Sequence, residues 1–161
     1  METEKIIHKN LSSKGISYEL TLCLWAGLLI SLSLIGFFLI MKELNLYQVL
    51  AFRYFNFVIL LVGIAIAFNI YHNKLAKNGI EYLAGLKMGL QITVIAVIPF
   101  VIFMAIYLMI DEKFMMFIRQ NGEFGNYLSP ISAAGVVAIE GFVGGAITTY
   151  MAMQYFKDNS E

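Results

Sequence analysis

The stretch YELTLCLWAGLLISLSLIGFFLIM, residues 18–41, decides the class of fold, because Glu19 is its only charged residue. A helix rises 1.5 Å per residue, so about 20 apolar residues cross the roughly 30 Å of hydrocarbon in a bilayer. Three more apolar runs follow, at about residues 47–71, 82–110 and 131–156. Across the whole chain 60% of residues are hydrophobic and 14% are charged, against about 25% charged in globular proteins. We therefore predict an integral membrane protein.

The length of the four runs favours helices over strands. Strands of a membrane β-barrel are segments of roughly ten residues with alternating polarity, whereas these runs are longer and almost uniformly apolar. Together they leave too few polar residues to coat a water-facing surface. We predict an all-α membrane protein in which residues 1–161 form one domain, a four-transmembrane-helix bundle.

Lysine and arginine outside the runs set the orientation, because the cytoplasmic side of a membrane protein carries an excess of these residues. Four spans place both termini on the same side. That side holds six basic residues and the other side three: Lys5, Lys9, Lys14, Lys74, Lys77 and Lys157 against Lys42, Lys113 and Arg119. We predict that both termini are cytoplasmic. The first run starts too late and is too long for a cleavable signal peptide.

The only long loop, residues 111–130, lies on the predicted outer face. Phe114, Phe117 and Ile118 fall on one side of a helix in its first half, while Lys113 lies on the other. This pattern predicts a helix lying on the lipid surface as an interfacial connector. A lid over a central cavity is the alternative.

Sequence signatures of enzymes are absent from the chain. It has no H-E-x-x-H, C-x-x-C, G-x-S-x-G or P-loop motif, and His8 and His72 lie in separate flanking segments. Asp111 and Glu112 adjoin a lysine at the end of a run, which is typical of a solvated turn. Cys23 lies inside the first run and is expected to be a small buried hydrophobe. We predict a non-enzymatic protein with no catalytic residue, metal, cofactor or nucleic-acid partner.

One carboxylate interrupts the fourth run. Glu140 stands in VVAIEGFVGGAITTY, residues 136–150, and a charge near the centre of a membrane helix costs about 2.5 to 3.5 kcal/mol. Arg53 enters the second run from the same predicted side, and the depths of the two Cα atoms differ by about 5 Å. We predict that Glu140 and Arg53 form an intramembrane charge pair. The alternative is an ion site centred on Glu140.

Three other polar residues are candidates for a polar lining. Asn56 follows Arg53 at i+3, and Gln91 follows Lys87 at i+4, so each shares a helix face with a charged residue. Lys87 lies near the inner surface and can extend its amine toward water. These faces are expected to avoid lipid.

Small residues mark the helix faces that pack most closely. Gly85 and Gly89 form a G-x-x-x-G pattern in the third run, and Gly141 and Gly145 form another in the fourth. Small side chains let membrane helices approach closely, so that dispersion and weak polar contacts hold them together. We predict that these faces pack on each other within one chain, with packing across a homodimer as the alternative.

Pro99 stands in the middle of the third run. It has no backbone N–H to donate and its ring presses on the carbonyl of Ile95, so a kink is expected there. Transporters use such breaks as hinges, although membrane helices also carry proline without moving. The sequence does not decide whether Pro99 marks a hinge or a static kink.

The segment IYHNKLAKNGIEYLAGLKMGLQIT, residues 70–93, joins a basic loop and a glycine to a run that opens on GLKMGL. In this layout the chain resembles a bacterial family of small four-span integral membrane proteins classed as a domain of unknown function. The resemblance implies a four-span protein of a bacterial inner (cytoplasmic) membrane. It does not include the Glu140 region and implies no role for it.

Two classes of function follow. The first is a non-enzymatic accessory or assembly subunit that packs through its small-residue faces with a second copy or another membrane protein in the bilayer. The alternative is a small proton- or cation-coupled transporter that uses Glu140, superficially similar to small four-span multidrug exporters with one membrane glutamate. This chain differs from those exporters because it is longer, its glutamate is in the last run, and Arg53 could neutralise it.

Overall fold

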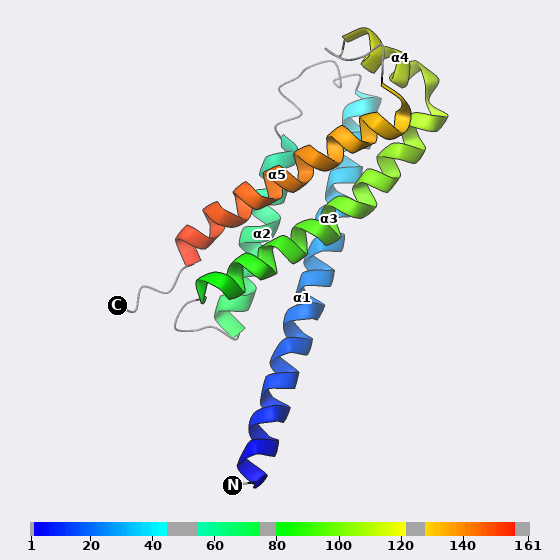
Figure 1. The fold of residues 1–161 in the computed structure, drawn as a ribbon. Helices are drawn as coiled ribbons and strands as arrows, with labels where there is room; N and C mark the ends of the chain where they lie inside the picture. The colour runs from blue at the N-terminus through cyan, green and yellow to red at the C-terminus, as the bar shows by residue number, and fades with distance from the viewer. Residues whose placement is uncertain (1, 45–54, 75–79, 122–127, 157–161) are drawn as a thin grey trace.

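The structure, a computed structural model, describes residues 2–44, 55–74, 80–121 and 128–156. Within them the chain is all-α and forms five helices (Figure 1). In chain order these are α1 (Glu2–Glu43), α2 (Phe55–Lys74), α3 (Tyr82–Ile110), α4 (Glu112–Asn121) and α5 (Pro130–Phe156).

Four of these helices are long and apolar enough to cross a membrane: Tyr18–Glu43, Phe55–Lys74, Tyr82–Ile110 and Pro130–Phe156. The third has the predicted limits, and the first and fourth agree with the prediction to within two residues. The second ends three residues later than predicted, and the first part of the predicted run, residues 47–54, lies outside the described residues. The prediction of a multi-pass, all-α membrane protein is confirmed.

The four long helices pack in a ring in the order α1, α3, α5, α2, and α2 returns to α1. The most completely buried side chains come from α2, α3 and α5 and include Ile64, Phe68, Ile92 and Met153. Large apolar side chains on the outer surfaces of the ring, such as Ile139 of α5, are exposed, as expected for a surface that faces lipid. The core therefore lies where the four helices meet.

The seam between α3 and α5 is built from small residues on both helices. A methyl group added at Gly145 would collide with Thr93, and one added at Gly141 would lie 3.0 Å from Val97. Each step of four residues along α3 matches a step of four in the opposite direction along α5. The four contacts are Gly85 with Met153, Gly89 with Thr149, Thr93 with Gly145, and Val97 with Gly141. The two glycine faces thus pack on each other within one chain.

Helix α1 continues well beyond the ring. It has 42 residues and is therefore about 63 Å long, twice the thickness of the hydrocarbon core. Figure 1 shows its N-terminal part extending past the ends of the other helices. Residues 2–17, predicted to lie outside the membrane, thus continue the first spanning helix.

Helix α4 lies at the opposite end of the ring from the N-terminal end of α1 and the C-terminal end of α5 (Figure 1); we call this the α4 end. Its Met115 is buried with Leu108 of α3 and Ala133 of α5, and Phe114 and Ile118 pack against this cluster. The predicted helix in the long loop is present. Its apolar side, however, packs on the ends of α3 and α5, because these ends present apolar residues that compete with lipid for the same face.

Helix α3 is continuous through Pro99. Phe100, the next residue, is buried among the helices. A proline can remain inside a membrane helix where neighbouring structure satisfies the carbonyl that it frees. The hinge proposed from the sequence stays a prediction.

Candidate functional site

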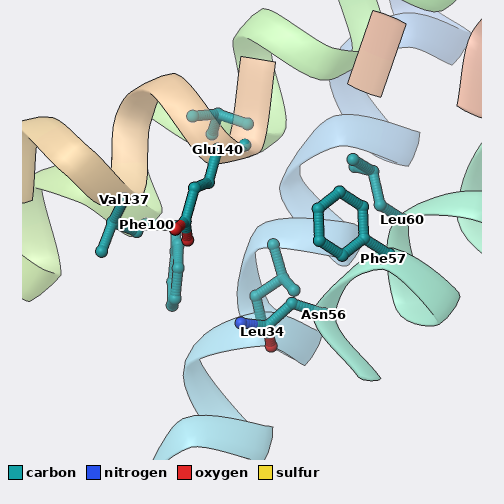
Figure 2. Close-up of a pocket in the computed structure, with 9 residues that line it drawn as sticks. Leu34, Asn56, Phe57, Leu60, Phe100, Val137 and Glu140 are labelled. Atoms are coloured by element: carbon teal, nitrogen blue, oxygen red, sulfur yellow. The ribbon is translucent and has the colours of Figure 1, made fainter. Parts of the chain in front are cut away.

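A cavity of about 50 Å³ lies among the four spanning helices. The volume is enough for ordered water or a small ion, because a cavity needs only about 10–15 Å³ of this kind of volume to hold a water molecule. The lining residues are Leu34 of α1, Asn56, Phe57 and Leu60 of α2, Val97 and Phe100 of α3, and Val137, Glu140 and Gly141 of α5 (Figure 2). Among the residues that the structure describes, the walls are therefore mainly apolar, with one carboxylate and one amide.

The periodicity of α5 explains how Glu140 reaches the cavity. Val137, Glu140 and Gly141 are separated by three and four residues, so they share one side of the helix, and all three line the cavity. Figure 2 shows the Glu140 side chain leaving α5 and pointing toward the space beside Asn56. Glu140 is half-buried. Its carboxylate thus belongs to the interior side of α5.

The two predicted groups around Glu140 have different outcomes. Asn56, predicted as part of a polar lining, is half-buried and lines the same cavity as Glu140. Arg53, the predicted partner of Glu140, lies outside the described residues. The Glu140–Arg53 charge pair therefore stays a prediction.

The other predicted lining residues lie elsewhere. Lys87 is exposed, and neither it nor Gln91 lines the cavity described above. The Gln91 Oε1 atom lies 3.8 Å from the Cys23 Sγ atom, within reach of a weak S–H hydrogen bond. Cys23 itself is buried. The structure thus places Asn56 at the cavity with Glu140 and Gln91 beside Cys23.

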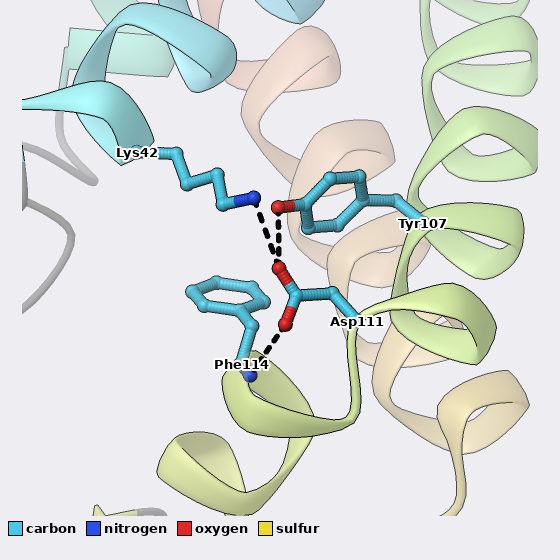
Figure 3. Close-up of polar contacts among 4 residues, drawn as sticks. All are labelled: Lys42, Tyr107, Asp111 and Phe114. Atoms are coloured by element: carbon cyan, nitrogen blue, oxygen red, sulfur yellow. Dashed lines mark hydrogen bonds and ion pairs between the residues drawn. The ribbon is translucent and has the colours of Figure 1, made fainter.

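A polar cluster at the α4 end was not predicted from the sequence. Asp111 Oδ2 lies 3.0 Å from the Lys42 amine and accepts a 2.8 Å hydrogen bond from the Tyr107 hydroxyl. Its other oxygen, Oδ1, accepts a 3.0 Å hydrogen bond from the backbone N–H of Phe114, in the first turn of α4 (Figure 3). The Lys42 amine also lies 4.9 Å from the centre of the Tyr107 ring. We call Lys42, Tyr107 and Asp111 the polar latch.

These contacts lower the pKa of Asp111 from 3.8 to about 2. The largest cause is the hydrogen bond from the Phe114 backbone, followed by those from Lys42 and Tyr107. The sequence suggested a solvated turn at Asp111. A signal for its local role was present, because an aspartate directly before a helix commonly accepts a bond from the N–H three residues later. No sequence signal places Lys42 beside it.

A metal centre would need several ligands close together. Among the residues that the structure describes, no group of three or more histidine, cysteine, aspartate or glutamate side chains is arranged to hold a metal ion. Glu140 and Asn56 are instead one carboxylate and one amide from two different helices. Carboxylate and amide oxygens are the types of ligand that bind a hydronium ion or a small hard cation.

Comparison of the chain with protein-family models, curated proteins and solved structures gives no match. The resemblance to a four-span bacterial family thus stays a prediction.

Proposed function

We propose that the protein is a non-enzymatic, multi-pass protein of the bacterial inner membrane, a four-helix bundle with both termini in the cytoplasm, that binds a proton or a small cation at Glu140. One observation carries the proposal. A carboxylate and an amide from two helices line a small cavity to which all four spanning helices contribute. An ionisable residue inside a spanning segment is a candidate functional residue by default.

The size and chemistry of the cavity define what it can bind. A volume of about 50 Å³ excludes drug-sized organic molecules, whose sites measure roughly 300–1,000 Å³. Carboxylate and amide oxygens are ligands for hard cations, and a carboxylate also takes up a proton. The apolar walls strengthen the attraction of Glu140 for a cation, because a low dielectric screens charges poorly. A proton or a monovalent cation is therefore the proposed ligand.

Thermal unfolding of the purified protein in lipid nanodiscs tests this proposal. A ligand that binds only the folded state stabilises it by RT ln(1 + [L]/Kd), about 2.7 kcal/mol at 100 times Kd. We expect Na⁺, K⁺ or Li⁺ to raise the unfolding temperature of the wild type. Glu140→Gln should lose this shift.

Glu81→Gln is the matched control, because it is the same chemical change at a residue that is exposed next to the start of α3. It should keep the full shift. An equal shift in Glu140→Gln and the wild type would refute the proposed site. Proteoliposomes with an internal pH- or cation-sensitive dye would then distinguish binding alone from coupled transport.

An accessory or assembly subunit is the second candidate, and the length of α1 favours it. Residues 2–17 continue a helix beyond the ring (Figure 1) and offer a surface to another protein. The glycine faces of α3 and α5 are occupied within the chain, so a partner would meet other surfaces. Crosslinking in membranes followed by mass spectrometry should then recover a stoichiometric partner, and deletion of residues 2–17 should release it.

A further inference from the structure

Four aromatic rings lie between the Glu140 cavity and the α4 end. The ring of Phe38 is their centre, with centroid distances of 6.0 Å to Phe103, 5.1 Å to Tyr107 and 5.7 Å to Phe114. Tyr107 also lies 5.9 Å from Phe103 and 6.0 Å from Phe114. Most of these pairs meet edge to face, the favourable geometry for aromatic rings. We call these four residues the ring cluster.

The positions along α1 place the ring cluster in a layered arrangement. Leu34 lines the cavity, Phe38 belongs to the ring cluster, and Lys42 belongs to the polar latch. These residues are spaced by four, so they share one face of α1 and are separated by about 6 Å per step. The same helix face thus passes from the cavity through the rings to the latch.

Helix α3 repeats this order in the same direction. Phe100 lines the cavity, Phe103 and Tyr107 belong to the ring cluster, and Asp111 accepts the contacts of the polar latch. Because α1 and α3 pack on each other and both run toward the α4 end (Figure 1), the layers on the two helices meet. The seam between them is filled by rings and closed by an ion pair.

We propose that the ring cluster and the polar latch form a gate between the Glu140 cavity and the α4 end. The inference rests on the proposed function for its purpose, since a binding site inside a membrane protein needs a route that opens and closes. Phe114 connects the two layers, because its ring belongs to the cluster and its backbone N–H donates to Asp111. Release of Asp111 therefore frees both Lys42 of α1 and the first turn of α4.

Cysteine accessibility in nanodiscs tests the gate, because both membrane faces are open to the reagent and the result does not depend on orientation. The reporter is Leu34→Cys in a Cys23→Ala background, since Leu34 lines the cavity and is buried. The probe is a cationic, membrane-impermeant methanethiosulfonate. Asp111→Asn should raise the labelling rate about tenfold, which corresponds to the loss of about 1.4 kcal/mol of contacts in the polar latch.

The neighbouring Glu112→Gln is the control, because Glu112 is exposed and lies outside the latch. It should leave the labelling rate within about twofold of the reporter protein, as for most exposed substitutions. Tyr107→Phe in α3 and Lys42→Met in α1 break the latch at its other two residues, and Tyr107→Phe keeps the ring. If Asp111→Asn does not fold, these two variants decide the question, and both should accelerate labelling.

Equal labelling rates in the reporter protein and the latch variants would overturn the gate. Rapid labelling with the latch intact would also overturn it, because the cavity would then be reached by another route. The accessibility assay tests the gate without added Na⁺, K⁺ or Li⁺, whereas the loss of ligand stabilisation in Glu140→Gln tests the site. A failure of the gate is therefore distinguishable from a failure of the proposed function.

Discussion

The seam between α3 and α5 makes a prediction in which two similar substitutions have effects of opposite sign. Gly145 and Gly135 both lie in α5. A methyl group at Gly135 would meet nothing within 4 Å, whereas one at Gly145 would collide with the side chain of Thr93. Glycine to alanine favours a helix by about 0.5–1 kcal/mol at either position. Only Gly145→Ala adds a clash.

Thr93 cannot easily rotate away from the added methyl group. Its hydroxyl is buried and donates a 2.9 Å hydrogen bond to the carbonyl of Gly89, and a β-branched side chain in a helix has few rotamers. The seam must therefore widen, and overpacking of this kind costs about 1–3 kcal/mol. After subtraction of the helix preference, Gly145→Ala should lower the free energy of unfolding by about 1 kcal/mol, within a range of roughly 0–2.5 kcal/mol.

Gly135→Ala should instead raise the free energy of unfolding by about 0.5–1 kcal/mol. Because both variants gain the same helix preference, the difference between them measures the clash alone. Unfolding of the purified protein from mild detergent micelles by added sodium dodecyl sulfate, followed by circular dichroism or tryptophan fluorescence, provides the free energies. If Gly145→Ala is as stable as Gly135→Ala, the close approach at Thr93 is wrong.

Two further predictions concern the charged residues. If Glu140 and Arg53 form a pair, Glu140→Gln and Arg53→Gln should each destabilise the protein, and the double variant should recover part of the loss. A double-mutant cycle should then give a coupling of about 1 kcal/mol or more. Additive losses of stability would exclude the charge pair. The lowered pKa of Asp111 means that its contribution to stability is complete above its ordinary value of 3.8 and is lost as the pH falls toward about 2. Thermal unfolding between pH 2 and 6 should show this loss in the wild type and in Glu112→Gln but not in Asp111→Asn, and a retained loss in Asp111→Asn would assign it to another group.

Local patterns in the sequence predicted the spanning helices and their closest faces. Hydrophobicity over about 20 residues located the third span, residues 82–110, at its observed limits. The free energy of transfer into lipid is favourable for each apolar side chain, regardless of its neighbours. The G-x-x-x-G spacing located the faces of α3 and α5 that meet. Both properties belong to a single helix and are therefore readable without knowledge of the fold.

Contacts between helix ends could not be predicted in the same way. Lys42 and Asp111 meet because α1 and α3 end at the same level, which depends on how the two helices pack. Similarly, the spacing of Phe114 and Ile118 indicated an apolar face on α4, but an apolar face suits lipid and protein equally well. The sequence also showed that Asn56 and Gln91 lie on polar faces without showing that only Asn56 lines the cavity with Glu140.

Packing and site are joined at two neighbouring residues of α5. These are Glu140, which lines the cavity, and Gly141, which lies against Val97 of α3 in the seam. Gly141 and Val97 also line the cavity into which Glu140 points. The four matched contacts along the seam define one register between α3 and α5. A slip of α5 by one helical turn would move Glu140 about 5 Å along α3 and separate it from the cavity wall that α3 provides. The small residues therefore do more than hold two helices together, because the register that they impose sets the depth at which a carboxylate is placed among apolar side chains.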